Sequence, residues 1–192
     1  VRVTGKTMGE LRIVINGAGA AGISIAKLIL QMGFGSVILC DREGIVHSDA
    51  PSNNFMQEEM CRVTNPEGIK GSLADAMVGA DIFVGVSRPG MVTQEMVRSM
   101  AKDPIVFAMA NPVPEILPDD AKAAGAAVVG TGRSDFPNQV NNVLAFPGVF
   151  KGLLSVRAKS VTDSMKEEAA KALADVIAPE ELSPEYVLPN AF

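Results

Sequence analysis

Three glycines and one aspartate near the start of the chain have the types and spacing needed to hold phosphate groups and a sugar. Gly17, Gly19 and Gly22 follow the pattern G-x-G-x-x-G. In this pattern the first glycine permits a tight turn, the second lets backbone approach a pyrophosphate, and the third lets a helix pack against a strand. Asp41 follows at the distance expected of a carboxylate that accepts hydrogen bonds from ribose hydroxyls. We therefore predict a dinucleotide site in which Gly17, Ala18, Gly19, Ala20, Ala21 and Gly22 hold the pyrophosphate and Asp41 binds the adenosine ribose.

Asp41 and Arg42, at the ribose end of this site, influence whether NAD or NADP binds. A carboxylate at Asp41 would repel a 2′-phosphate, which favours NAD over NADP. Arg42 leaves the choice open, because its guanidinium could pair with that phosphate, lie along the adenine or remain solvated. We expect NAD or NADP as the cofactor, with NAD favoured. The alternative, a structural glycine turn that holds no nucleotide, leaves Asp41 unexplained.

Side-chain amides supply a second group of candidates. Asn111 precedes a proline, and Asn138, Asn141 and Asn142 cluster with Gln139. An amide offers donors and an acceptor without a charge, which suits a nicotinamide carboxamide or a substrate carboxylate. The alternatives are an Asn-Pro turn and a loop whose asparagines satisfy their own backbone.

Groups for proton transfer or metal binding are scarce. His47 is the only histidine and Tyr186 the only tyrosine, and no second His or Cys stands at metal-ligand spacing. Asp119 and Asp120 have the position of acids at the start of a helix. We expect a chain that binds a dinucleotide but carries no catalytic acid–base pair and no metal site of its own.

Short apolar runs alternate with helical segments and would position these residues. We expect strands at 11–15, 37–39, 81–86, 105–109 and 126–129. We expect helices from Ala21, within 53–60, after the caps Ser72 and Thr93, from Pro118, from Ser160 and Asp163 to about Ile177, and from Ser183-Pro184. This order predicts an α/β fold: a three-layer, Rossmann-type, doubly wound, mainly parallel sheet with helices on both faces, formed by residues 1–192 as one domain. Ligands in such sheets lie past the carboxyl ends of the strands, which adds Ser87 to the cofactor-binding candidates.

Composition excludes several classes of protein. The 192 residues are 47% hydrophobic, enough for a substantial core, and the net charge of −5 argues against a nucleic-acid partner. No apolar stretch is long enough for a membrane span, and the N-terminus lacks the apolar core of a signal peptide. Two cysteines, Cys40 and Cys61, suggest a reducing compartment, so we expect a cytoplasmic protein.

Several longer motifs together resemble the NAD(P)-binding, C-terminal domain of malic enzyme in its small prokaryotic form. They are VTGKTMGELRIVINGAGAAGISIAKLIL, CDREG, GVSRPG, FAMANPVPEI and GTGRSDFPNQVNNVLAFPGVFKG, followed by the region of Pro184. The resemblance implies oxidative decarboxylation of malate to pyruvate and CO2 with reduction of NAD(P) and a divalent metal, Mg2+ or Mn2+. It also implies that Asn111 and Asn142 contact the nicotinamide half of the cofactor and the substrate, with Asn141 a weaker match.

The resemblance also shows what this chain lacks. In the family a tyrosine and a lysine perform the acid–base chemistry and three carboxylates bind the metal, and none of them has a match here. Because the chain starts at Val1 without an initiator methionine, we expect a piece of a longer protein. The resemblance implies that the intact enzyme is a homo-oligomer (a dimer) and that this piece is inactive alone. The alternatives are a non-catalytic dinucleotide-sensing module and another NAD-dependent dehydrogenase.

Overall fold

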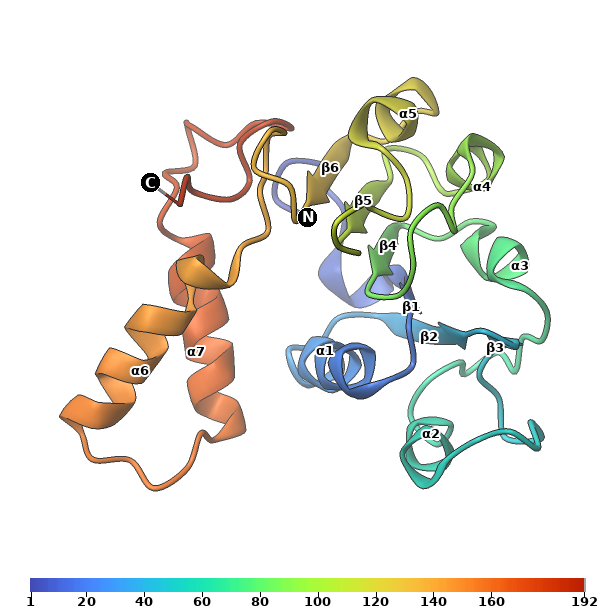
Figure 1. The fold of residues 1–192 in the computed structure, drawn as a ribbon, viewed down its shortest axis with the longest axis horizontal. Coiled ribbons are helices and arrows are strands. Elements are labelled where there is room, and N and C mark those ends of the chain that lie inside the picture. The colour runs from blue at the N-terminus through green and yellow to red at the C-terminus, as the bar shows by residue number, and fades with distance from the viewer. Residues whose placement is uncertain (192) are drawn as a thin grey trace.

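A six-stranded sheet forms the centre of the computed structural model, which describes residues 1–191. Its strands are β1 (Arg12–Asn16), β2 (Ser36–Asp41), β3 (Gly44–Ile45), β4 (Ile82–Gly85), β5 (Ile105–Ala108) and β6 (Val128–Thr131). They lie in the order β3-β2-β1-β4-β5-β6, and all neighbours are parallel except β3, which pairs antiparallel with β2 (Figure 1). The predicted Rossmann-type, mainly parallel sheet is therefore confirmed.

Alternate residues of the central strands pack into two separate cores. Ile13 and Ile15 lie in one core, and Val14 between them lies in the other. All three are fully buried, which explains why β1 is a continuous apolar run rather than an alternation of apolar and polar residues. Such a strand needs helices over both of its faces.

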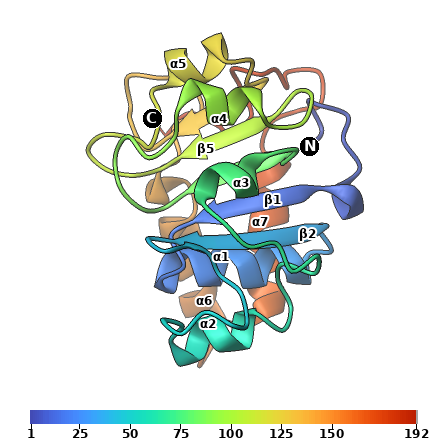
Figure 2. The same ribbon diagram turned by 90° about the vertical axis from the view of Figure 1, so that its right-hand side faces the viewer.

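The described residues form seven α-helices, five of which pack against the sheet. They are α1 (Ala20–Gln31), α2 (Phe55–Met60), α3 (Leu73–Met77), α4 (Gln94–Arg98), α5 (Pro118–Ala123), α6 (Phe146–Ser155) and α7 (Asp163–Ala174). Residues of α3, α4 and α5 join the core on one face, and those of α1 and α2 join the core on the other. In Figure 2, α3 and α4 lie in front of the strands and α1 behind them. The predicted helices on both faces are confirmed.

The N-terminal starts of α3, α4 and α5 follow the capping rules. The Ser72 side chain accepts a hydrogen bond from the backbone N–H of Asp75, and Thr93 accepts one from Met96. Pro118 occupies the first turn of α5, where its missing N–H costs no helical hydrogen bond. These three predicted helix starts are confirmed.

Two predictions near the C-terminus are wrong in detail. The long helix α7 starts after Thr162, whose side chain caps it, and ends at Ala174 rather than near Ile177. No helix forms at Ser183-Pro184. Instead Ser183 and Tyr186 pair across a tight turn, with the N–H of Tyr186 donating to the Ser183 carbonyl at 3.0 Å. Proline fits the second position of such a turn as well as the first turn of a helix, so its presence alone does not decide between them.

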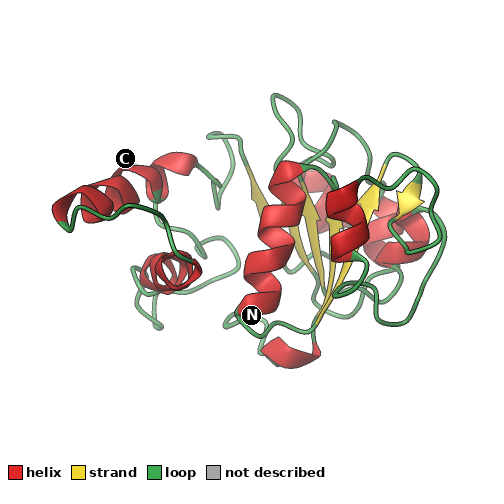
Figure 3. Cartoon of the chain, turned by 90° about the horizontal axis from the view of Figure 1, so that it is seen from below, coloured by secondary structure: helices red, strands yellow, loops and turns green. Residues whose placement is uncertain are grey.

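The hairpin of α6 and α7 stands apart from the sheet. Figure 3 shows it beyond α1, on the side away from the strands. Neither helix contains a buried residue, and the large apolar side chains Phe146, Phe150 and Leu154 of α6 are exposed. The sequence did not predict α6, because Pro147 and Gly148 resemble helix breakers, yet both lie in its first turn, where proline is tolerated.

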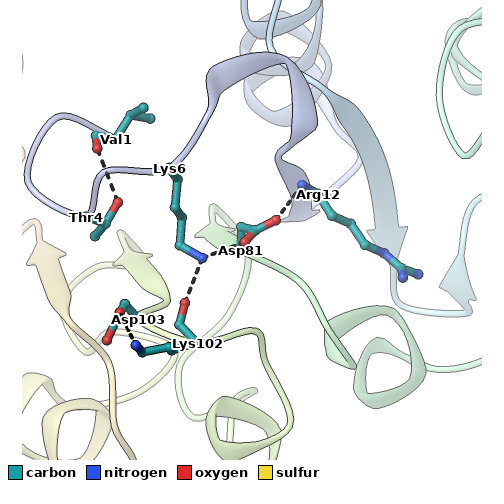
Figure 4. A network of polar contacts seen from close by, with 7 residues as sticks. All are labelled: Val1, Thr4, Lys6, Arg12, Asp81, Lys102 and Asp103. Carbon is teal, nitrogen blue, oxygen red and sulfur yellow. Dashed lines mark hydrogen bonds and ion pairs between the residues drawn. The ribbon is translucent and has the colours of Figure 1, made fainter.

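A partly buried polar network ties the lead-in residues to the amino-terminal edge of the sheet (Figure 4). Lys6 Nζ lies 2.6 Å from Asp81 Oδ1 and also donates to the carbonyl of Lys102. Asp81 Oδ2 accepts from the N–H of Arg12, at the start of β1. The network fixes the start of β1 beside the start of β4. Among residues 1–191, none of the helices has the length and apolar character required to cross a bilayer.

Candidate functional site

A cavity of about 370 Å³ opens at the carboxyl ends of β1, β2 and β4. This is where the strand order reverses, since the chain runs outward from β1 through β2 to β3 and returns to the other side of β1 as β4. In open α/β sheets ligands bind at such a position. The cavity is lined by Asn16, Gly17, Ala18, Gly19, Asp41, Arg42, Glu43, Ser52, Asn54, Gln57, Ser87, Arg88 and Met91.

Two of the three glycines of the turn have a steric reason in the structure. Gly17 has φ of 122°, and a Cβ there would lie 2.7 Å from the carbonyl oxygen of Val86. A Cβ on Gly22 would lie 1.9 Å from the carbonyl oxygen of Gly17, so helix α1 approaches the strand closely only without a side chain. Gly19, which precedes α1, faces open space. A dinucleotide pyrophosphate fits this cradle, because backbone and the N-terminus of a twelve-residue helix are exposed beside it.

Asp41 ends β2 and is held by two donors. Its Oδ1 accepts a hydrogen bond from the N–H of Glu43 at 2.8 Å, and its Oδ2 accepts one from Gln57 Nε2 at 3.0 Å. Arg42 pairs with Glu43 at 3.0 Å, with its side chain 80% exposed. The carboxylate is therefore oriented within the cavity, while the guanidinium lies in a solvated ion pair.

Gln57 is a cavity residue that the sequence reasoning missed. It is the third residue of α2, and its Oε1 accepts from the backbone N–H of Asn54, whose own side chain accepts from the N–H groups of Met56 and Gln57. This reciprocal arrangement is a capping box. The Asn-x-x-Gln pattern was a signal that could have revealed the helix start, but not the contact with Asp41.

Glu115 is a second residue that the sequence reasoning missed. Its side chain is fully buried, and it accepts hydrogen bonds from the N–H of Ser87 at Oε1 and from the N–H of Ala110 at Oε2, each at 3.0 Å. A Cβ on Gly85 would lie 2.4 Å from its carboxyl carbon. Glu115 therefore joins the loops that follow β4 and β5. Nothing in its local sequence distinguishes it from a surface carboxylate.

Ser87 is also fixed from the other side, since Asn16 Nδ2 donates to its Oγ at 2.8 Å. The structure thus brings Gly17, Gly19, Asp41, Arg42 and Ser87 to one cavity, as the order of strands predicted. Their contacts with a cofactor remain predictions.

The predicted asparagines do not line this cavity. Asn111 is exposed after β5, with a cis peptide bond to Pro112, and lies against Gly132. Asn142 is exposed at the start of the 3₁₀ helix η2 (Asn142–Leu144), and the side chain of Asn141 caps that helix by accepting from the N–H of Val143. The predicted roles of Asn111, Asn141 and Asn142 toward the nicotinamide and substrate remain predictions.

Asn138 has a structural role. It is 5% exposed, donates from Nδ2 to the carbonyls of Val129 and Pro184, and accepts at Oδ1 from the N–H of Val187. These three bonds attach the C-terminal segment to β6. Of the two interpretations of the asparagine cluster, Asn138 fits the one in which the side chain forms hydrogen bonds with backbone groups.

Cys40, Cys61 and His47 are the thiol and imidazole side chains of the chain. Burial, and to a lesser extent the neighbouring Asp41 carboxylate, raises the pKa of Cys40 to about 12, so its thiol stays protonated. Both cysteines are free thiols. His47 Nδ1 is buried with no hydrogen-bond partner among the described residues. No group of three His, Cys, Asp or Glu residues within 1–191 could hold a metal ion.

The strand order, the glycine cradle and the carboxylate at the end of β2 together define a dinucleotide-binding α/β domain of the Rossmann type. Comparison with known families specifies it further. Residues 1–191 match the model of the family described as malic enzyme, NAD binding domain. The chain belongs to this family.

Individual relatives agree with this assignment. The chain is 52% identical over 193 residues to the bifunctional malic/malolactic enzyme of Bacillus subtilis (strain 168), covering 100% of this chain and 47% of that protein. It is 46% identical over 192 residues to the NAD-dependent malic enzyme of Geobacillus stearothermophilus, covering 100% of this chain and 40% of that protein. Further relatives are named NADP-dependent malic enzymes.

A solved structure extends the likeness to three dimensions. The crystal structure of the NAD-dependent malic enzyme from Thermotoga maritima superposes with a TM-score of 0.93 at 45% sequence identity, covering 98% of this chain and 50% of that one. The chain therefore spans about half the length, or less, of the relatives it matches.

Proposed function

We propose that this chain is the cofactor-binding part of a malic enzyme that oxidises malate to pyruvate and CO2 while reducing NAD(P), with NAD preferred. The observation that carries the proposal is the common cavity of the glycine turn and Asp41 at the switch point of the sheet. Family membership supports the reaction, and relatives with either cofactor support NAD or NADP.

The chain's own residues would bind and orient the cofactor. Gly17 to Gly22 would surround the pyrophosphate with backbone N–H groups, and Asp41 would accept hydrogen bonds from the adenosine ribose. Ser87, held by Asn16 and Glu115, would border the path toward the nicotinamide. The bound dinucleotide supplies the hydride acceptor for the reaction.

We further propose that residues 1–192 form one NAD(P)-binding domain and that the acid–base pair and the Mg2+ or Mn2+ site belong to a different part of the polypeptide. The residues described here do not fit a metal, since no suitable group of ligands exists among them. The exposed apolar strip of Phe146, Phe150 and Leu154 supports contact with a further domain, because large exposed apolar patches mark interaction surfaces. Asn111 and Asn142 would reach the nicotinamide and substrate in that assembled site.

The intact enzyme is proposed to be a cytoplasmic homodimer that takes malate and releases pyruvate. Its family membership supports the substrate, and the two free thiols support a reducing compartment. Sedimentation of the full-length protein tests the dimer.

The decisive experiment compares the 192-residue chain with the full-length protein. After circular dichroism has verified that the chain alone is folded, calorimetry should detect NAD binding to both proteins, and Asp41→Ala should weaken it. Malate-dependent NADH formation should occur only with the full-length protein and its metal. Turnover by the chain alone would contradict the placement of the acid–base pair elsewhere.

A further inference from the structure

Asn16 is a buried amide in the wall of the cavity, at the carboxyl end of β1. The residue is 2% exposed, although every other residue of β1 after Arg12 is apolar. A polar side chain buried in a strand costs stability unless it is hydrogen-bonded. Its Nδ2 donates to the Oγ of Ser87 at 2.8 Å, and this contact is the reason that an amide is tolerated there.

Ser87 is held at two of its atoms. Its backbone N–H donates to the buried carboxylate of Glu115 at 3.0 Å, and its Oγ accepts from Asn16. A serine hydroxyl has one O–H donor and two lone pairs, so an amide N–H that occupies a lone pair turns the O–H away from itself. Within residues 1–191 this O–H has no acceptor, and Ser87 is an exposed residue of the cavity wall. The hydroxyl is therefore a donor that Asn16 leaves available to a ligand.

This donor lies beside the glycine turn. The carbonyl oxygen of Val86, one residue before Ser87, would lie 2.7 Å from a Cβ on Gly17, so the loop after β4 touches the turn. The turn leads into the N-terminus of the twelve-residue helix α1, where free backbone N–H groups attract phosphate oxygens. A hydroxyl donor at this place adds a hydrogen bond to a charged acceptor, which is stronger than one between neutral groups.

We propose that Asn16 is a positioning residue that directs the O–H of Ser87 toward a pyrophosphate oxygen of the dinucleotide. The inference rests on the proposed role of this cavity as the dinucleotide site. Ser87 makes the contact, and Asn16 acts through it. Because ADP, NAD and NADP all contain the pyrophosphate, the pair raises the affinity for all three by the same factor and takes no part in the choice between NAD and NADP.

The first test measures dissociation constants for ADP, NAD and NADP by calorimetry on the full-length protein. Ser87→Ala removes the donor and should weaken the binding of all three about tenfold, the effect of losing one hydrogen bond to a charged group. Ser87→Thr keeps the hydroxyl and should keep the affinity. Since Ser87 is exposed, both variants should fold as the wild type does, which circular dichroism verifies.

A double-mutant cycle tests whether Asn16 acts through Ser87. Asn16→Ala lets the hydroxyl rotate and should weaken ADP binding about threefold, but cause no further loss when Ser87→Ala is already present. Asn16→Asp keeps the shape of the side chain, but its carboxylate only accepts. It should draw the O–H of Ser87 toward itself and weaken binding more than Asn16→Ala does.

Asn138 supplies a matched control, because it is also a buried asparagine that donates from Nδ2, and it does not line the cavity. Asn138→Ala should lower the melting temperature as Asn16→Ala does, but leave the affinity for ADP unchanged.

The other outcomes separate the inference from the proposed function. An equal loss from Asn16→Ala in both backgrounds would show that Asn16 does not act through Ser87. A loss of NAD affinity without a loss of ADP affinity in Ser87→Ala would place the contact on the nicotinamide half and overturn the pyrophosphate assignment. If Ser87→Ala changes nothing while Asp41→Ala weakens NAD binding, the inference is wrong and the dinucleotide site stands. If the wild-type protein binds neither ADP nor NAD, the proposed function fails and the inference fails with it.

Discussion

The buried carboxylate of Glu115 allows the most direct test of how the site is built. It joins the loops after β4 and β5 through the N–H groups of Ser87 and Ala110. The same loops are joined by two backbone bonds, from Gly90 N to the Pro114 carbonyl and from Val92 N to the Glu115 carbonyl. The Glu115 side chain adds hydrogen bonds to the backbone just after both strands, and its removal should loosen the wall of the cavity.

The magnitude follows from the bonds that are lost. Glu115→Ala leaves two backbone N–H groups without acceptors and a void where the side chain was, so we expect a loss of about 3–5 kcal/mol in the free energy of unfolding. Glu115→Gln keeps one acceptor oxygen but turns an N–H2 group toward the other donor, and should cost about 1.5–3 kcal/mol. Both variants should also weaken NAD binding, because Ser87 borders the cavity.

Urea unfolding of the full-length protein, followed by circular dichroism, measures these losses. Glu185→Gln is a suitable control, since that carboxylate pairs with Lys122 on the surface and should show no measurable effect. Stability of Glu115→Ala within about 0.5 kcal/mol of wild type would refute the idea that Glu115 joins the two loops.

Three further outcomes are expected. Gly22→Ala should lower the melting temperature and abolish NAD binding in calorimetry, because its Cβ would meet a carbonyl oxygen at 1.9 Å; wild-type affinity would contradict this. Burial raises the pKa of Cys40 from 9.0 to about 12, so above pH 9 the thiol loses its proton in the unfolded chain before it does so in the folded one. The free energy of unfolding should therefore be unaffected by this thiol below pH 9 and should fall progressively from pH 9 to about 12. Unfolding curves at pH 7 to 11 should show this loss, and Cys40→Ala should reduce it. Asn138→Ala should speed hydrogen exchange at the amide of Val187, which loses its acceptor, and unchanged exchange there would show that the C-terminal segment is held by other contacts.

The local features of the fold could be predicted from the sequence because they depend on neighbouring residues. The glycine turn needs glycine at Gly17 and Gly22 for reasons of backbone geometry, and buried strands such as β1 need apolar runs. Caps such as Ser72 and Thr93 act within one helical turn. Helix α6 and the turn at Ser183 escaped prediction because proline suits several local structures, and packing decides among them.

The sequence by itself determined that the chain can hold a dinucleotide, through the spacing of the glycines and the carboxylate at Asp41. Tertiary structure alone decided which side chains support that site. Gln57 reaches Asp41 from helix α2, and Glu115 reaches Ser87 from the loop after the neighbouring strand β5. Contacts of this kind have no periodicity along the chain, because the packing of the sheet, and not the local sequence, sets the distance between their partners.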